Sequence, residues 1–397
     1  MTLKLQDAYL VAATRTPVAR RNGMFRNVRP DDLLAHVLQA SVAQVPQLDP
    51  HEIGDVYVGC AIPEGEQGMN VARLGVLMAG LPDTVPAITI NRFCSSGLNA
   101  VAMAADRIRL GEAEVAIGAG VESMSVMPQM FGKGYSANPK WMQDEHVALA
   151  YGMGLTAERV AERWKVSGVD QDAFAAASHA KALAAIAAGH FDAEITPYAV
   201  TDYLPGADGL VKRVERQCRS DEGPRAGTTP EQLAKLRPVF AAKGAVTAGN
   251  ASQMSDGAGS VVLMSEAALK RYNVEPLARF VSFAVAGVPP EVMGIGPVEA
   301  IPRALKAAGL TLADIDWFEL NEAFAAQALA VMRSLDIDPA KVNPQGGAIA
   351  LGHPLGATGA IRTATLAHGM RRTGKRYGMV TMCVGMGQGA AGIFELV

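Results

Sequence analysis

The same order of elements, a glycine-rich loop, a helix and a short apolar strand, occurs twice in this chain and limits how it can fold. In the first copy, NRFCSSG (91–97) leads into apolar residues at helical spacing over 98–108, and VAIGAG (115–120) follows as a strand. In the second, GHPLGATG (352–359) leads into an alanine-rich helix, predicted over roughly 355–372, and the strand GMVTMCV. Short apolar strands bounded by glycine are typical of sheets that helices cover on both faces. We therefore predict an α/β fold with two similar halves, in which mixed or parallel sheets lie between layers of helices.

A segment of different composition separates these two copies. Residues 122–250 begin rich in Met, Gly and Pro, continue with the helical pattern QDAFAAASHAKALAAIAAGHF, and include a basic stretch around KRVERQCRSDEGPR. Long segments of this kind often cover a ligand on a rigid scaffold. We expect an N-terminal half over 1–121, completed by about 246–270, an inserted loop or lid domain over 122–245, and a C-terminal half over 271–397.

The composition argues against several classes of function. A net charge of -3 and a pI near 6.2 give no global basic field, so a protein that coats nucleic acid or an anionic membrane is not expected. No apolar run reaches the roughly 20 residues that span a bilayer, and the start of the chain resembles a first strand more than a signal peptide. The seven histidines form no HxH or HExxH spacing, so we expect no metal site.

The cysteines indicate a reducing compartment. They lie far apart in the sequence, with no CxxC pair, which argues against a disulfide framework and a zinc ribbon: Cys60, Cys94, Cys218 and Cys383. The cytoplasm is the expected location.

Chemically active side chains occur in four short segments where the predicted strands end. These are NRFCSSG with Cys94, NEAF (321–324) with Asn321, GHPLGATG with His353, and CVGMGQG (383–389) with Cys383. Open α/β sheets usually bind ligands at such strand ends. Glycine in these loops lets backbone N–H groups approach a substrate without obstruction by a side chain.

Each of these residues also has a simpler structural interpretation. Free cysteine is often buried, so Cys94 and Cys383 can be packing residues. His353 can be a core or capping histidine, and Asn321 can be the N-cap of a helix beginning at Glu322. Together, a thiol at a helix N-terminus that favours thiolate, a base, a second acid or base and an amide donor make a complete acyl-transfer set.

The chain carries NRFCSSGL, VTAGNASQMSDGAG, NEAFAAQ, GGAIALGHPLGATGAIR and CVGMGQGAAGIFE in this order. By these segments it resembles the thiolases over nearly its whole length, and in particular the degradative 3-ketoacyl-CoA thiolases (acetyl-CoA acyltransferases). The resemblance implies the thiolase fold, an αβαβα layering with an inserted loop domain. It also implies cleavage of a 3-oxoacyl-CoA by CoA to acetyl-CoA and a chain-shortened acyl-CoA in a β-oxidation type of degradation. CoA is then a substrate, and no prosthetic group is implied.

The resemblance also assigns roles to the four segments. Cys94 becomes acylated, His353 takes its proton, and Cys383 is the second acid or base. Asn321 holds a water that, with His353, stabilises the enolate of the leaving thioester. The backbone N–H groups of Cys94 and Gly385 stabilise the tetrahedral oxyanion. A thiol suits proton transfer to carbon because its pKa can be brought close to neutral.

The resemblance places CoA against three further residues. Arg225 of DEGPR contacts the adenine end, Ser252 of GNAS lies beside the pantetheine, and Met153 of MGLTAE is a third contact. Arg225 can equally be a solvated charge, and Ser252 can bond only to its own turn. A cluster of nearby cations is a further hypothesis for attracting the CoA phosphates: Lys212, Arg213, Arg216 and Arg219.

One departure from the family pattern concerns the length of the substrate. Short-chain acetoacetyl-CoA thiolases commonly carry a histidine just before the Met-Gly of the MGxTAE motif, whereas this chain has Gly152 between Tyr151 and Met153. A small residue there leaves room, so we expect medium or long 3-oxoacyl chains to be accepted.

Three other functions remain open at the level of sequence. The first is a short-chain acetoacetyl-CoA thiolase that works in the condensation direction. The second is a condensing 3-oxoacyl synthase, although its second and third catalytic groups are typically both histidines and position 383 is a cysteine. The third is a non-catalytic binding protein of this fold in which Cys94 is inert.

The resemblance also bears on partners. Family members are homodimers or homotetramers, and residues around 122–145 are candidates for the second contact. A 3-hydroxyacyl-CoA dehydrogenase or a hydratase is a candidate partner, because the preceding steps supply a 3-oxoacyl-CoA. Neither nucleic acid nor a membrane span is expected.

Overall fold

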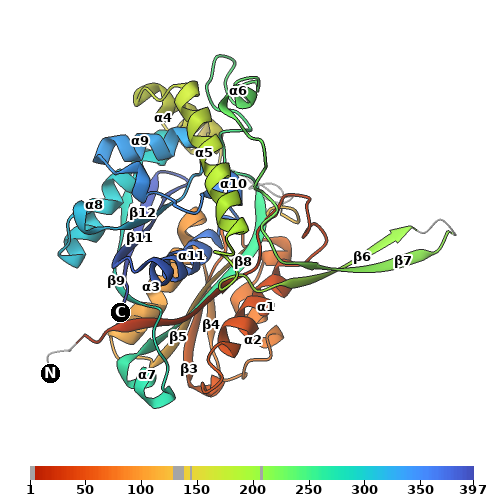
Figure 1. The fold of residues 1–397 in the computed structure, drawn as a ribbon, viewed down its shortest axis with the longest axis vertical. Coiled ribbons are helices and arrows are strands. Elements are labelled where there is room, and N and C mark those ends of the chain that lie inside the picture. Colours follow the sequence, from red (N-terminus) through yellow and green to blue (C-terminus); the bar gives the residue numbers. More distant parts are fainter. Residues whose placement is uncertain (1–4, 128–137, 144, 206–208) are drawn as a thin grey trace.

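A computed structural model describes residues 5–127, 138–143, 145–205 and 209–397, and within them ten strands form one mixed sheet (Figure 1). Five of these strands belong to the N-terminal half: β1 (Ala8–Arg15), β3 (Ile53–Gly59), β4 (Ala87–Ile90), β5 (Val115–Ser123) and β8 (Ser255–Ser265). A two-residue strand, β2 (Ala19–Arg20), pairs with β8. The remaining four belong to the C-terminal part: β9 (Ala278–Gly287), β10 (Trp317–Leu320), β11 (Tyr377–Val384) and β12 (Gln388–Glu395). Their order is β10-β11-β12-β9-β1-β8-β5-β3-β4.

This order contains the same arrangement twice. From the middle outward, β1, β8, β5 and β3 correspond to β9, β12, β11 and β10. In both sets the outermost pair is parallel, β3 with β5 and β10 with β11, and the other pairs are antiparallel. The two sets meet where β1 pairs with β9, with Ala8 opposite Phe280. The predicted duplication is therefore present, and the two sheets join into one.

Helices cover both faces of each half. The main helices of the two halves are α1 (Pro30–Ala43), α2 (Val71–Met78), α3 (Ser96–Arg109), α7 (Glu266–Tyr272), α8 (Gly296–Ala308), α9 (Ala325–Leu335) and α11 (Thr358–Thr373). Helices α3 and α11 lie in the centre, α1 and α2 cover one outer face, and α8 and α9 cover the other (Figure 1). Three separate hydrophobic cores fill the spaces between these layers. The fold is thus the expected αβαβα arrangement.

The two central helices nearly match the sequence prediction. Helix α3 ends before Gly111, and β5, which follows it, is buried along its whole length. Helix α11 begins at Thr358, three residues later than predicted. The backbone before it includes Gly352 at φ +94°, which lies outside the helical region.

The N-terminal ends of α3 and α11 touch backbone to backbone. A Cβ added to Gly359 would lie 2.0 Å from the backbone nitrogen of Leu98, and one added to Gly97 would lie 2.8 Å from that of Ala360. Only glycine permits this approach. It brings the loop that carries Cys94 next to the loop that carries His353.

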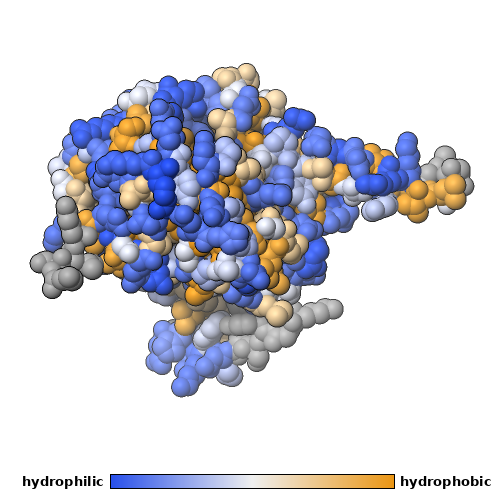
Figure 2. Space-filling view, turned by 90° about the horizontal axis from the view of Figure 1, so that it is seen from below, coloured by the Kyte–Doolittle hydropathy of each residue, from blue (hydrophilic) through white to orange (hydrophobic). Residues whose placement is uncertain are grey.

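The segment between β5 and β8 forms the periphery of the molecule. It contains α4 (Met153–Arg163), α5 (Gly168–Ala187), the four-residue helix α6 (Pro230–Leu233), and a hairpin of β6 (Tyr198–Pro205) and β7 (Val211–Cys218). The hairpin projects from the body, with apolar side chains near its far end (Figures 1 and 2). Much of the segment expected to supply a tetramer contact lies outside the described residues. In the described part of the chain, no helix is long and apolar enough to cross a bilayer.

Candidate active site

Cys94 lies in a tight turn that immediately precedes α3. The turn spans Phe93–Ser95, and Phe93 adopts φ +42°, a strained value for a residue with a side chain. The Cys94 side chain is 9% exposed. Its sulfur faces two backbone N–H groups, its own and that of Gly385. The structure therefore places the thiol at the edge of solvent, with two donors directed at it.

Burial changes the expected acidity of this thiol. Loss of hydration raises the pKa of Cys94 to about 11, although the N–H groups of Gly385 and Cys94 act in the opposite direction. The prediction that the helix terminus would favour the thiolate is wrong for the free protein, because desolvation outweighs these two N–H groups. In the resting protein Cys94 is a thiol, so a base must take its proton when it reacts.

His353 is held as a neutral base by its neighbours. Its Nδ1 lies 2.6 Å from Thr358 Oγ1, and the Thr358 hydroxyl donates to the Pro354 carbonyl at 2.9 Å. Thr358 Oγ1 must then accept from Nδ1–H, which leaves Nε2 unprotonated. Burial, together with the positive charge of Arg362, lowers the pKa of His353 to about 3. Nε2 is thus unprotonated at neutral pH and can accept a proton.

Asn321 faces this same nitrogen. Its Nδ2 lies 3.3 Å from His353 Nε2, and its backbone N–H donates to the Thr381 carbonyl at 2.9 Å. Asn321 is not a helix N-cap, because α9 begins only at Ala325. The side-chain Oδ1 is buried and has no hydrogen-bond partner among the described residues. A buried acceptor without a partner is costly, so a water or substrate group at this point would be stabilising.

Cys383 lies near the end of β11 and is fully buried. It packs in a small apolar cluster with Ala157, Met293 and Phe324, against which Met153 also packs. Burial raises its pKa well above the ordinary value, and the nearby Cys94 raises it further. The expectation of a thiol pKa close to neutral is therefore wrong for the free protein. The electrostatic effect of Cys94 also means that the two thiols are close neighbours.

Gly385 belongs to the turn that joins β11 to β12. The next two residues of the turn have positive φ, 62° at Met386 and 81° at Gly387. A Cβ at Gly385 would lie 3.7 Å from both Met153 Sδ and the Phe93 ring. Strained turns therefore flank the thiol on two sides, at Phe93 and at Met386, as is common where a site is held in one geometry.

The three residues expected to contact CoA come from different parts of the periphery. Met153 is the first residue of α4, and the Ser252 backbone N–H donates to the Ala323 carbonyl of the NEAF segment at 2.9 Å. Arg225 has an exposed side chain, and its backbone N–H donates to His179 Nδ1 at 3.1 Å. The structure thus brings Met153 and Ser252 next to the buried residues, whereas Arg225 lies in a more peripheral loop.

The additional cations proposed for CoA attraction are partly neutralised. Arg213 pairs with Glu215, and Arg216 pairs with Asp202 at 2.8 Å, both within the β6–β7 hairpin. Because this hairpin projects from the body, these charges support an attraction of CoA only weakly.

Several residues that hold the site together had no recognisable signal in the sequence. The Gln253 side-chain Nε2 donates to the backbone carbonyls of Gly223, Ile349 and Ala350, and the Gln253 backbone carbonyl accepts from the His353 N–H. Glu322 accepts from Ser178 at 2.6 Å. Gln253 directly follows Ser252, and Glu322 directly follows Asn321. In the sequence, only this adjacency to predicted site residues indicates a role for them. In the described part of the chain, no cluster of His, Cys, Asp and Glu could hold a metal.

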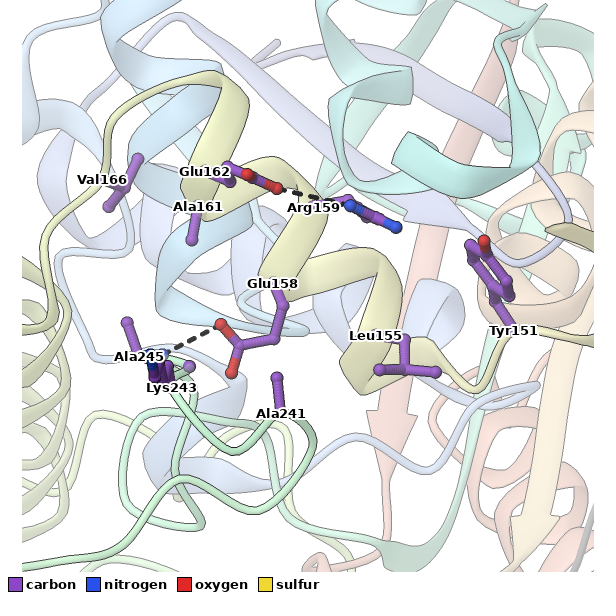
Figure 3. A pocket seen from close by; sticks show the side chains of 11 residues that line it. Tyr151, Leu155, Glu158, Arg159, Ala161, Glu162, Val166, Ala241, Lys243 and Ala245 are labelled. Carbon is purple, nitrogen blue, oxygen red and sulfur yellow. Dashed lines mark hydrogen bonds and ion pairs between the residues drawn. The ribbon is translucent and has the colours of Figure 1, made fainter.

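A pocket of about 600 Å³ lies between α4 and the segment around residues 241–245 (Figure 3). Three of its charged groups, Glu158, Arg159 and Glu162, make other contacts. Glu158 accepts from the backbone N–H groups of Ala245 and Val246 at 2.9 and 3.0 Å, and Arg159 lies 3.5 Å from Glu162. None of the buried side chains described above lines it. We therefore separate this pocket from the reaction centre.

Comparison with known proteins identifies the family of the chain. The family model of the thiolase N-terminal domain matches residues 8–267, and that of the thiolase C-terminal domain matches residues 274–396. The 3-ketoacyl-CoA thiolase of Bacillus subtilis is 52% identical, covering 99% of this chain and 100% of the relative. The peroxisomal 3-ketoacyl-CoA thiolase 5 of Arabidopsis thaliana is 48% identical, covering 98% of this chain and 85% of the relative.

Solved structures show the same similarity in three dimensions. Human mitochondrial 3-ketoacyl-CoA thiolase superimposes with a TM-score of 0.88 at 39% identity, covering 99% of this chain and 100% of that one. The dimeric peroxisomal thiolase of Saccharomyces cerevisiae gives a TM-score of 0.89 at 41% identity, covering 99% of this chain and 98% of that one. With both family domains and full-length relatives matched, the chain belongs to the thiolase family.

Proposed function

We propose that this protein cleaves 3-oxoacyl-CoA thioesters with CoA, giving acetyl-CoA and a chain-shortened acyl-CoA in a β-oxidation type of degradation. One observation carries the proposal: a thiol, Cys94, lies beside a second thiol, Cys383, and faces the Gly385 N–H, while His353 is fixed as a neutral base. The names of the relatives from Bacillus subtilis and Arabidopsis thaliana support the same activity.

In the first half of the proposed reaction, Cys94 becomes acylated. As its sulfur attacks the 3-keto carbon, the thiol proton passes to His353 Nε2. The C2–C3 bond then breaks, and the enolate of acetyl-CoA takes a proton from the Cys383 thiol. The high pKa of Cys94 favours this order, because the thiolate never accumulates in the resting protein.

In the second half, the shortened acyl group leaves. The Cys383 thiolate takes the proton of an incoming CoA thiol, whose sulfur attacks the acyl carbon on Cys94. Cys94 departs and regains the proton held by His353, so the enzyme returns to its starting state. The N–H groups of Cys94 and Gly385 are the proposed donors to the oxyanion, since both already point at the sulfur that carries the acyl group.

We propose Asn321 as the residue that holds a water beside His353. Its Nδ2 faces His353, and its buried Oδ1 lacks a partner among the described residues. A water bonded to Oδ1 would remove the cost of that buried acceptor and donate to the thioester oxygen when the enolate forms.

The space around Gly152 supports a substrate longer than acetoacetyl-CoA. A Cβ added at this position would meet no atom within 4 Å, so the site of the histidine in short-chain relatives is open here. We propose that medium or long 3-oxoacyl chains are accepted. We further propose that residues 122–245 form an insert that contributes Arg225 and Met153 to CoA binding, and that Ser252, just beyond it, is a third contact. The N-terminal half then covers 1–121 and is completed by about 246–270, and the C-terminal half covers 271–397.

We also propose a homodimer that works in a reducing compartment such as the cytoplasm. Strand β4 lies at the end of the described sheet, and Ile88 on it is 46% exposed and lines a hollow with Met103, Leu110 and four charged residues. Such an edge favours pairing with a second copy. All four cysteines are free, as a reducing compartment would require. A 3-hydroxyacyl-CoA dehydrogenase, which forms the 3-oxoacyl-CoA, or the hydratase that acts before it is the proposed partner enzyme.

The first test is CoA-dependent consumption of acetoacetyl-CoA and of 3-oxooctanoyl-CoA by the purified protein, beside Cys94→Ser. We expect faster turnover of the longer substrate and a loss of at least about 10³-fold in the variant. Activity on acetoacetyl-CoA alone would refute the chain-length proposal. Absence of activity on both would contradict the proposed function and favour a binding protein.

A further inference from the structure

One face of α5 contacts three separate loops of the site. Ser178 Oγ donates to Glu322 Oε2 at 2.6 Å, next to Asn321, and Asp172 Oδ1 accepts from Asn250 Nδ2 at 3.0 Å, near Ser252. His179 Nδ1 accepts from the Arg225 N–H at 3.1 Å. A single helix of the peripheral segment therefore holds both the buried residues and the loop proposed to bind CoA.

The contact of α5 with the catalytic loops is close and leaves little freedom. Gly346 adopts φ +83°, and a Cβ there would lie 2.7 Å from both the Ala182 Cβ and the Ser178 carbonyl. The Gly347 N–H donates to Ser178 Oγ at 3.1 Å. Glu322, bonded to the same hydroxyl, also accepts from the Ile349 N–H at 3.2 Å. Ser178 thus fixes the start of the chain segment that leads to His353.

The contact of α5 with the Arg225 loop requires a neutral imidazole. Only an unprotonated Nδ1 can accept the Arg225 N–H. His179 is 6% exposed, and burial together with the charge of Arg225 lowers its pKa, which keeps the ring neutral. The Arg225 carbonyl accepts from Thr228 Oγ1 at 3.0 Å. The backbone of Arg225 is thereby held on both sides while its side chain extends into solvent.

We propose that two adjacent residues of α5 are positioning residues for different steps: His179 aligns Arg225 for CoA, and Ser178 aligns the Glu322 segment for the chemistry. This inference rests on the proposed function and adds to it the residues that fix the loop carrying Arg225. Loss of the His179 contact frees one backbone N–H and lets the loop sample other conformations, so CoA binds less tightly. Loss of the Ser178 contact instead loosens the segment between Asn321 and His353, so the chemical steps slow.

The test compares His179→Leu with His179→Asn in steady-state thiolysis of 3-oxooctanoyl-CoA. We expect the leucine variant to raise the KM for CoA about tenfold and to change kcat less than about twofold. Asparagine places Oδ1 where Nδ1 was, so it should restore most of the wild-type KM. Ala180→Ser, an exposed neighbour on α5, is the matched control and should leave both parameters unchanged.

Ser178→Ala completes the comparison and should do the reverse, lowering kcat about tenfold with the KM for CoA nearly unchanged. Equal losses in kcat and KM in both variants, or no rescue by asparagine, would overturn the proposal, because a merely structural helix affects both parameters alike. Calorimetric titration of CoA into each variant, without turnover, measures affinity separately. A wild-type protein that binds CoA but cleaves nothing would refute the proposed function, and the calorimetric comparison of His179→Leu with His179→Asn would still decide the inference.

Discussion

The two halves of this protein share one topology but contribute different chemistry. Cys94 precedes α3 in the first half, and His353 precedes α11 in the second, so corresponding loops supply a nucleophile and a base. The strands that follow these helices, β5 and β11, differ in the same way. Their penultimate residues are Glu122 and Cys383, and each lies opposite a glycine of the neighbouring antiparallel strand.

Glu122 occupies the position in the first half that Cys383 occupies in the second. Its buried carboxylate accepts from the Ala61 and Gly356 N–H groups, both at 2.8 Å, and from Gln67 at 2.6 Å. Gly356 lies in the loop that carries His353. At equivalent positions, one half therefore supplies a structural anchor for the other half's loop, whereas the second half supplies a candidate acid. A duplicated fold can divide anchoring and chemistry between its copies.

The largest effect is expected where the two halves touch. Gly359→Val would push a side chain against the backbone of Leu98, 2.0 Å from where its Cβ must lie, and neither backbone can yield without moving a central helix. We expect a loss of about 3 kcal/mol or more in the free energy of unfolding, or no folded protein. Denaturant unfolding with activity assays measures this.

Gly287→Ala is the matched control for that substitution. A Cβ at Gly287 would meet no atom within 4 Å, so its stability should stay within about 1 kcal/mol of the wild type. If both variants lost the same stability, the tight contact between the helices would not be the cause.

A smaller effect is expected from the residue that orients His353. Thr358→Ala removes the acceptor for Nδ1–H, so the ring can turn or change tautomer and present the wrong nitrogen to Cys94. We expect kcat to fall about 10- to 100-fold with little change in stability, and Thr358→Ser, which keeps the hydroxyl, to restore most of the rate. An alanine variant with wild-type kcat would show that packing alone orients the ring.

The comparison of the halves also explains what could be predicted from sequence. Local periodicity identified α3, β5, α11 and β11, because each element carries its own pattern of apolar residues. The motifs at their ends identified Cys94 and His353 as candidates, and the structure brings their loops together. The pairing of β1 with β9 has no local signature, since it depends on which strand edges remain free after each half folds.

The errors and omissions have a similar physical origin. The prediction that Cys94 favours the thiolate rests on its position at a helix end. Desolvation, however, depends on the whole surrounding fold, and this desolvation raises the pKa of Cys94 to about 11. The roles of Thr358, Gln253 and Ser178 depend on contacts formed only after folding. Polar residues of this kind look like ordinary loop or helix residues in a single sequence.

The smallest effect concerns the pH dependence of stability. The folded pKa of His353, about 3, lies below the roughly 6.5 of an unfolded histidine, so between these pH values the unfolded chain binds more protons. Stability from this residue is fully present above pH about 6.5 and declines as pH falls towards 3.

Between pH 7 and 5, wild type should lose about 2 kcal/mol more in the free energy of unfolding than His353→Asn, which has no group to titrate there. Glu319, with its pKa raised to about 7 by burial, titrates in both proteins and cancels. Denaturant unfolding at the two pH values measures the difference, and an equal loss in both proteins would mean that His353 is not held neutral by the fold.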